Sequence, residues 1–107
     1  MAFVKTHDIS ELNEDLIGKQ VVLGGWIEDL RKLGKMSFIT LRDISGISQI
    51  IVKGELNDNL GEINRQSVVI IKGIVQETKA RDFAFEVKAE EIEVLAKAIS
   101  VIYPQTL

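Results

Sequence analysis

Residues 36–53 alternate between apolar and polar side chains in two short runs. At the two-residue period of a β-strand, Ile39 and Leu41 of the first run share one face. The opposite face carries one aromatic and two polar side chains, those of Phe38, Thr40 and Arg42. The pattern predicts a strand with one buried face and one exposed face that contains an aromatic ring.

The second run has the same period and predicts a second strand. Ile50 and Val52 share its apolar face, and the opposite face carries Gln49, Ile51 and Lys53. A four-residue turn, residues 43–46, ends in glycine and folds the two runs into an antiparallel hairpin. Phe38 and Gln49 then lie opposite each other or diagonally, within reach of one another. A register shift of one residue would instead turn Phe38 into the core.

The rest of the chain supplies further elements in a fixed order. We expect a short helical turn within residues 8–18, a strand over 20–29, a loop over 30–35, a short irregular helix over 54–66, a strand buried on both faces over 67–75, a charged loop over 76–82, and a strand over 83–88. Residues 91–98 either extend this last strand or form a separate edge. Gly24 and Gly25 inside the first strand indicate a bulge, a sharp bend or a close backbone approach.

This order predicts an all-β fold, the five-stranded Greek-key barrel called the OB-fold, with a short N-terminal helical turn and a short helix between strands 3 and 4. The 107 residues and 46% hydrophobic content suit one domain over 1–107. We expect an N-terminal helical extension over about 1–19, the barrel over 20–98 and a tail over 99–107.

Composition removes most enzymatic and metal-dependent functions. With no cysteine and one histidine, His7, the chain lacks the ligands for a thiolate or histidine metal cluster and for a nucleophilic triad. It contains no phosphate-binding loop motif. No apolar run has the length of a membrane span or a signal peptide, so we expect a cytoplasmic protein with no membrane partner.

The remaining candidate chemistry lies on the face that an OB barrel presents through strands 2 and 3 and two loops. The net charge of −3 requires any polyanion to meet a local patch. Such a patch is available in Arg31, Lys32, Lys35, Arg42, Lys53, Lys79 and Arg81, and the polar Thr40 shares the face of Phe38 and Arg42. Phe38 beside these cations suits stacking on an unpaired base, and Gln49 suits hydrogen bonding to a base edge. A general single-strand binder and a protein-binding OB scaffold remain alternatives.

The chain also resembles the N-terminal anticodon-binding domain of class IIb aminoacyl-tRNA synthetases, and among these the archaeal-type aspartyl enzymes with Asp or Asn specificity. The matching segments are Lys5-Thr6-His7, Gly25-Trp26-Ile27, Leu30-Arg31-Lys32-Leu33-Gly34, Phe38-Ile39-Thr40-Leu41-Arg42-Asp43, Gly46 and Gln49. Two departures are Lys32, where an Asp is usual, and the tail residues 101–104, where Pro-Leu-Pro is usual.

The resemblance implies a role for several side chains. Phe38 would stack on the central anticodon base, a uridine, and Gln49 would read that base. Arg31 would contact the anticodon loop, and Glu86, which alternation also places outward, would help to select the first anticodon base. The implied partner is the anticodon loop of tRNA(Asp) or tRNA(Asn). ATP and Mg²⁺ would be needed only by a catalytic domain outside these residues, which would also provide the dimer interface, and this domain would hold no cofactor of its own.

Overall fold

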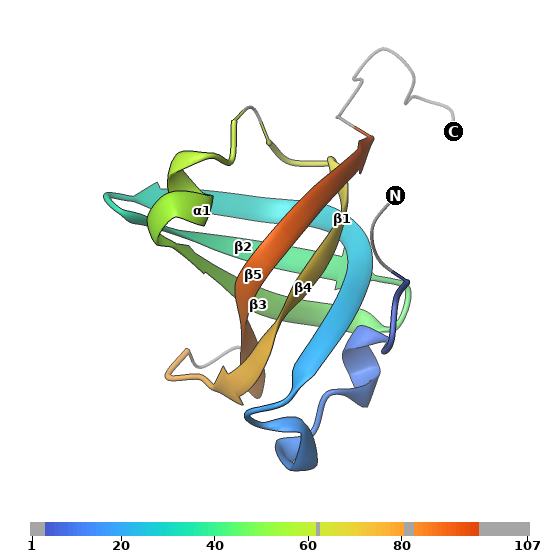
Figure 1. The fold of residues 1–107 in the computed structure, drawn as a ribbon. Coiled ribbons are helices and arrows are strands. Elements are labelled where there is room, and N and C mark those ends of the chain that lie inside the picture. The colour runs from blue at the N-terminus through green and yellow to red at the C-terminus, as the bar shows by residue number, and fades with distance from the viewer. Residues whose placement is uncertain (1–3, 62, 81–82, 97–107) are drawn as a thin grey trace.

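The structure is a computed structural model that describes residues 4–61, 63–80 and 83–96. Two 3-10 turns, η1 (Ile9–Glu11) and η2 (Glu14–Leu16), precede five strands and one short helix. The elements that follow are β1 (Gln20–Leu33), β2 (Met36–Asp43), β3 (Gly46–Lys53), α1 (Gly54–Asp58), β4 (Val68–Glu77) and β5 (Phe85–Ala96). The strands close a barrel in the order β1-β2-β3-β5-β4, with β3 and β5 parallel and the other pairs antiparallel (Figure 1). The predicted OB-fold is therefore confirmed.

In the hairpin of β2 and β3, the faces that were predicted to be buried and exposed are as predicted. Ile39, Leu41, Ile50 and Val52 all point into the barrel and are at most 1% exposed. Phe38, on the outer face, is half-buried. The one-residue register shift that would have buried Phe38 in the core does not occur.

β1 is longer than predicted and bends to serve two neighbours. Residues 20–26 pair with β4, and residues 26–33 pair with β2. At the bend, a Cβ on Gly25 would overlap the backbone carbonyl of Arg42, so the glycine permits a close backbone approach. The bulge lies further along, between Ile27 and Asp29. The loop predicted over 30–35 is wrong, because pairing with β2 keeps the chain extended to Leu33.

β4 does not have two fully buried faces, and that prediction is wrong. Its side chains alternate between buried positions, such as Val69 and Ile71, and half-buried positions, such as Ile70 and Ile74. A single closed sheet has only one interior, so the outer face of each strand keeps some contact with solvent.

The helix predicted over 54–66 is too long. α1 ends at Asp58, and the chain is not helical at residues 59–61 and 63–66. Gly61 and Gln66 both adopt positive φ angles, 69° and 74°, which break helical geometry. Leu60 and Ile63 still pack into the core.

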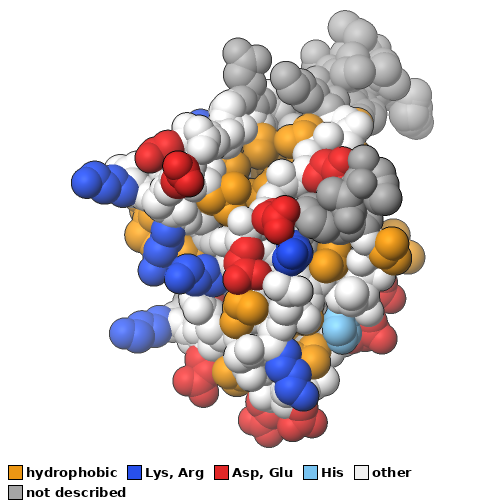
Figure 2. Space-filling view, in the orientation of Figure 1, with side chains coloured by type: hydrophobic (Ala, Val, Ile, Leu, Met, Phe, Trp, Pro, Cys, Tyr) orange, Lys and Arg blue, Asp and Glu red, His pale blue; other side chains and the backbone are white. Residues whose placement is uncertain are grey.

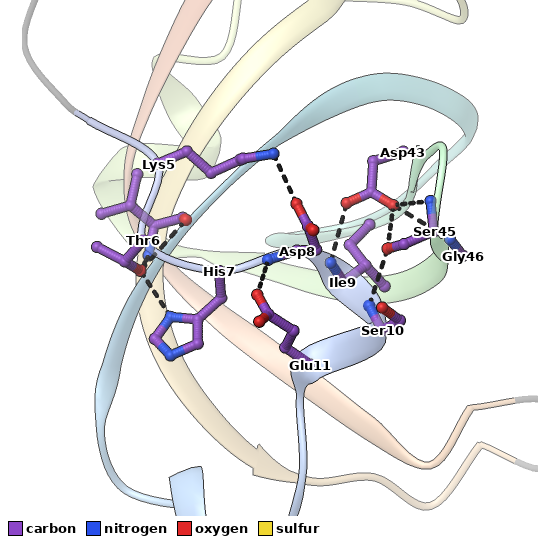
Figure 3. Close-up of polar contacts among 11 residues, drawn as sticks. Lys5, Thr6, His7, Asp8, Ile9, Ser10, Glu11, Asp43, Ser45 and Gly46 are labelled. Carbon is purple, nitrogen blue, oxygen red and sulfur yellow. Dashed lines mark hydrogen bonds and ion pairs between the residues drawn. The ribbon is translucent and has the colours of Figure 1, made fainter.

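The N-terminal segment closes the barrel end opposite α1 (Figure 1). It consists of two 3-10 turns in place of the single helical turn that was predicted. Ile9 inserts into the core, with 5% of its surface exposed. One Asp43 carboxylate oxygen accepts a hydrogen bond from the backbone N–H of Ile9 (2.9 Å), and the other accepts bonds from Ser45 and Gly46 (Figure 3). Thr6 donates its backbone N–H to the carbonyl oxygen of Val22 in β1, and its hydroxyl oxygen accepts a hydrogen bond from the Val22 N–H.

Candidate nucleic-acid interface

An open groove of about 460 Å³ runs over the outer face of the barrel. All five strands and the loop after β4 contribute to it. The described side chains that line it are those of Arg31, Met36, Phe38, Gln49, Ile51, Lys53, Gln76, Glu77, Thr78, Lys79, Ala80 and Glu86. The groove therefore combines an aromatic ring, aliphatic side chains, amides and charges of both signs.

Phe38 lies at the aromatic end of the groove. It pairs directly with Arg31 of β1 and with Ile51 of β3. The Arg31 guanidinium carbon is 5.7 Å from the centre of the Phe38 ring, within the range of a cation–π contact. Pairing across antiparallel strands thus places a cation beside a half-buried ring, a combination suited to a base and its phosphate.

Gln49 lies diagonally from Phe38, because its direct partner on β2 is Thr40 and the partner of Phe38 is Ile51. Its side chain faces the groove, as predicted, but only 8% of its surface is exposed. β5 explains this burial, since Glu86 pairs with Gln49 and accepts a hydrogen bond from its amide nitrogen, Nε2 (3.0 Å). Thr78 Oγ1 is 3.4 Å from the same nitrogen.

Among the groove residues that were not predicted from the sequence, Gln76 and Thr78 contact the pair of Gln49 and Glu86. Gln76 pairs with Glu86 from the other side, and its Nε2 donates to Glu86 Oε2 at 2.5 Å. Both residues fall in the segment interpreted as a charged loop. If the alternation of β4 is continued to Glu77, it places Gln76 on the outer face. A local pattern does not show, however, that Glu86 of β5 is the residue beside Gln76.

The groove gathers five of the nine predicted site residues: Phe38, Gln49, Arg31, Glu86 and Lys53. Lys35 lies next to it, in a separate apolar hollow that also includes Lys53 and Leu33. Figure 2 shows Lys and Arg side chains gathered around the tip of the β1–β2 hairpin, while Asp and Glu gather over the 3-10 turns.

The other three predicted site residues do not line the groove. Lys32 is exposed and follows Arg31 in the strand, so it projects from the other face of β1. Thr40 is half-buried beside Gln49. Arg42 forms an ion pair with Glu28, and this hydrogen bond holds the pKa of the Glu28 carboxyl below its ordinary value. Two further cations were predicted in the loop after β4. Lys79 lines the groove, and Arg81 lies outside the described residues.

Within the described residues there is no group of three or more His, Cys, Asp or Glu side chains arranged to hold a metal ion. No helix in the described part of the chain is both long and apolar enough to cross a membrane. A closed five-stranded barrel with an aromatic and partly cationic groove defines a single OB-fold domain of the nucleic-acid-binding class.

The chain belongs to the tRNA anticodon family of OB-fold nucleic acid binding domains, which residues 21–95 match. It is 40% identical over 98 residues to the aspartate–tRNA(Asp/Asn) ligase of Saccharolobus solfataricus, a match that covers 90% of this chain and 23% of the ligase. The resemblance to class IIb synthetases is thereby confirmed. The matched region is the anticodon-binding domain of these ligases and is not catalytic.

Solved structures give the same result. The asparaginyl-tRNA synthetase of Pyrococcus horikoshii superimposes with a TM-score of 0.76 at 31% identity, over 88% of this chain and 23% of the synthetase. OBody AM3L09, a structure bound to hen egg-white lysozyme, superimposes with a TM-score of 0.80 at 31% identity, over 91% of this chain and 100% of the OBody. The chain thus spans about a quarter of the synthetases and the whole length of the OBody.

Proposed function

We propose that this domain binds the anticodon loop of tRNA in the groove, with Phe38 stacked on the central base and Gln49 hydrogen bonded to its edge. The observation that carries the proposal is the meeting of Phe38, Gln49 and Arg31 in one open groove, in a chain of the anticodon-binding family. Stacking of one base on an exposed aromatic ring contributes about 1–3 kcal/mol. Arg31 and Lys53 supply positive charge for the phosphates on either side of that base.

The partner we propose is tRNA(Asp) or tRNA(Asn), which agrees with the specificities in the names of the relatives. We propose further that the domain serves an activity that ligates aspartate to tRNA with ATP. A catalytic domain outside these residues would bind ATP and Mg²⁺ and form the dimer interface, and the protein would act in the cytoplasm.

Titration of anticodon stem-loops tests the proposal. Loops with the sequences of tRNA(Asp), tRNA(Asn) and tRNA(Lys) are compared, each with its central uridine intact or replaced by cytidine. We expect the Asp or Asn loop with central uridine to bind most tightly. Phe38→Ala should weaken this binding by about 1–3 kcal/mol, because the stacking surface is lost.

Ile44→Ala is the matched control. Ile44 is 97% exposed in the turn between β2 and β3 and does not line the groove. Its removal should leave the affinity unchanged. Equal affinities for wild type and Phe38→Ala, or equal affinities for every loop and an unrelated single strand, would contradict anticodon recognition.

Protein binding is a second candidate, favoured by the similarity to an OBody that binds lysozyme. An outer barrel face with apolar side chains between polar ones also suits a protein partner. In this case, the partner should be captured from lysate equally well before and after RNase treatment. Loss of capture after RNase treatment would favour RNA.

A further inference from the structure

Glu86 occupies a central position in the groove. It lies on β5 between Gln49 of β3 and Gln76 of β4, and the backbone pairing sets each of these residues directly beside it. The three side chains therefore form a row across three adjacent strands. One carboxylate oxygen accepts from Gln49 Nε2 at 3.0 Å, and the other accepts from Gln76 Nε2 at 2.5 Å.

This row constrains the orientation of both amides. A side-chain amide has a donor end and an acceptor end of nearly equal size, so a free amide can present either end to a ligand. An ionised carboxylate has acceptors only, and it therefore binds the nitrogen end of each amide. In Gln49 the second amide proton faces the Thr78 hydroxyl, 3.4 Å away. The protein thus occupies the donor end of Gln49 and leaves the carbonyl oxygen as the end presented to a ligand.

We infer that Glu86 is a positioning residue which fixes the amides of Gln49 and Gln76, so that the Gln49 carbonyl oxygen faces ring position 3 of the base and selects a base with a hydrogen-bond donor at N3. This inference rests on the proposed function, since it names how the same groove distinguishes bases. Uracil has a donor at N3, whereas N3 of cytosine is an acceptor and would face the Gln49 carbonyl unfavourably. The inferred preference is therefore for uridine over cytidine.

The role differs from direct reading of the first anticodon base, which the resemblance implied for Glu86. Both oxygens of the Glu86 carboxylate already accept an amide proton, one each. Glu86 is half-buried between the two amides, and its hydrogen bonds hold the more deeply buried Gln49 in place. The arrangement favours an action of Glu86 through Gln49, and it adds Gln76 as a second positioning residue.

The near-isosteric variant Glu86→Gln tests the inference, because an amide at this position can donate as well as accept and no longer dictates the orientation of Gln49. The probes are three stem-loops whose central base is uridine, cytidine or 3-methyluridine, the last of which lacks the N3 donor. We expect wild type to prefer uridine by about tenfold over both other loops, as one well-placed hydrogen-bonding pair provides. In Glu86→Gln the uridine-to-cytidine ratio should fall to about threefold or less, with the cytidine loop bound more tightly than by wild type.

Glu90→Gln is the matched control, since it makes the same change on the same strand. Glu90 is exposed and accepts a hydrogen bond from Gln20, away from the groove. The base preference of this variant should equal that of wild type. Gln76→Leu provides a second test if Glu86→Gln unfolds, and it should lower the uridine-to-cytidine ratio to a value between wild type and Glu86→Gln.

The outcomes separate this inference from the proposed function. If Phe38→Ala weakens binding but neither Glu86→Gln nor Gln76→Leu changes the ratio, the groove binds RNA and the positioning role is wrong. A change in discrimination confined to the first anticodon base would also overturn it, in favour of direct reading. If wild type binds none of the loops, both the proposed function and the inference fail. A purely structural role would weaken all three loops equally and would likewise overturn the inference.

Discussion

Arg31 and Lys32 are adjacent cations with different surroundings. Arg31 lines the groove and sits beside the Phe38 ring, whereas Lys32 projects from the opposite face of β1. A count of charges in the sequence could not separate them, because both belong to the basic cluster of residues 31–35. Extension of β1 to Leu33 makes the alternation of the strand decide which cation faces the groove.

We expect Arg31→Met to weaken binding of the uridine-containing loop and Lys32→Met to have little effect. Loss of one phosphate contact should also reduce the slope of log affinity against log salt concentration by about 0.7. Titrations between 50 and 200 mM salt (about the range over which such slopes are resolved) measure both quantities. Equal slopes for wild type and Arg31→Met, or a larger change in Lys32→Met, would show that Arg31 does not contact phosphate.

The sequence allowed prediction of the side chains that depend on one strand or one hairpin. Phe38 and Gln49 were placed on one outer face from alternation alone, and the structure confirms that placement. Gln76 and Thr78 could not be found in this way. Their importance arises from the pairing of β4 with β5, and no local period specifies which residues of two distant strands face each other.

At the scale of elements, the bend in β1 sets the shape of the barrel. The strand pairs with β4 before Trp26 and with β2 after it, so its backbone must pass close to that of β2. Gly24 and Gly25 correctly indicated an unusual backbone. The sequence did not show whether this was a bulge, a sharp bend or a close backbone approach, or at which residue each would lie. The structure places the close approach at Gly25 and the bulge after Ile27.

We predict that Gly25→Ala lowers the free energy of unfolding by about 1–3 kcal/mol, because its Cβ would overlap the Arg42 carbonyl and backbone atoms must move. Gly24→Ala is the matched control. A Cβ there would lie 3.7 Å from Lys5 and 3.8 Å from Ile70, which is ordinary contact. Its effect should stay within about 0.5 kcal/mol. Urea denaturation measures both variants, and equal stabilities would contradict the close approach.

At the scale of the whole molecule, Asp43 joins the N-terminal segment to the hairpin and closes one end of the barrel. Burial by itself raises the pKa of Asp43, but hydrogen bonds from the Ser45 hydroxyl and from the backbone N–H groups of Ile9, Ser45 and Gly46 outweigh burial and lower it. The folded state therefore favours the ionised carboxylate. Its stabilising contribution is present above the pKa of the unfolded state, about 3.9, and is lost as pH falls through the lower pKa of the folded state.

We expect stability to decrease below about pH 4, with the contact between Asp43 and Ile9 among those lost. Asp43→Asn should reduce stability at pH 7 by about 2 kcal/mol, because hydrogen bonds to a charged acceptor are replaced by weaker ones. The variant should also show a smaller loss between neutral and acid pH. Asp58→Asn, at an exposed position of α1, serves as the control. A variant that loses as much stability in acid as wild type would contradict this role of Asp43.

The parallel pairing of β3 with β5 has a consequence for how the groove is assembled during folding. Phe38 and Gln49 lie on a hairpin whose contacts are local, whereas the bond between Gln49 and Glu86 joins residues 37 positions apart. Contacts of larger sequence separation carry a greater loop-closure entropy and form late. The stacking surface can therefore exist in a nascent hairpin before the amides acquire a fixed orientation. Base selectivity is then a property of the completed barrel. A chain in which β3 and β5 have not yet paired is expected to bind RNA without distinguishing between bases.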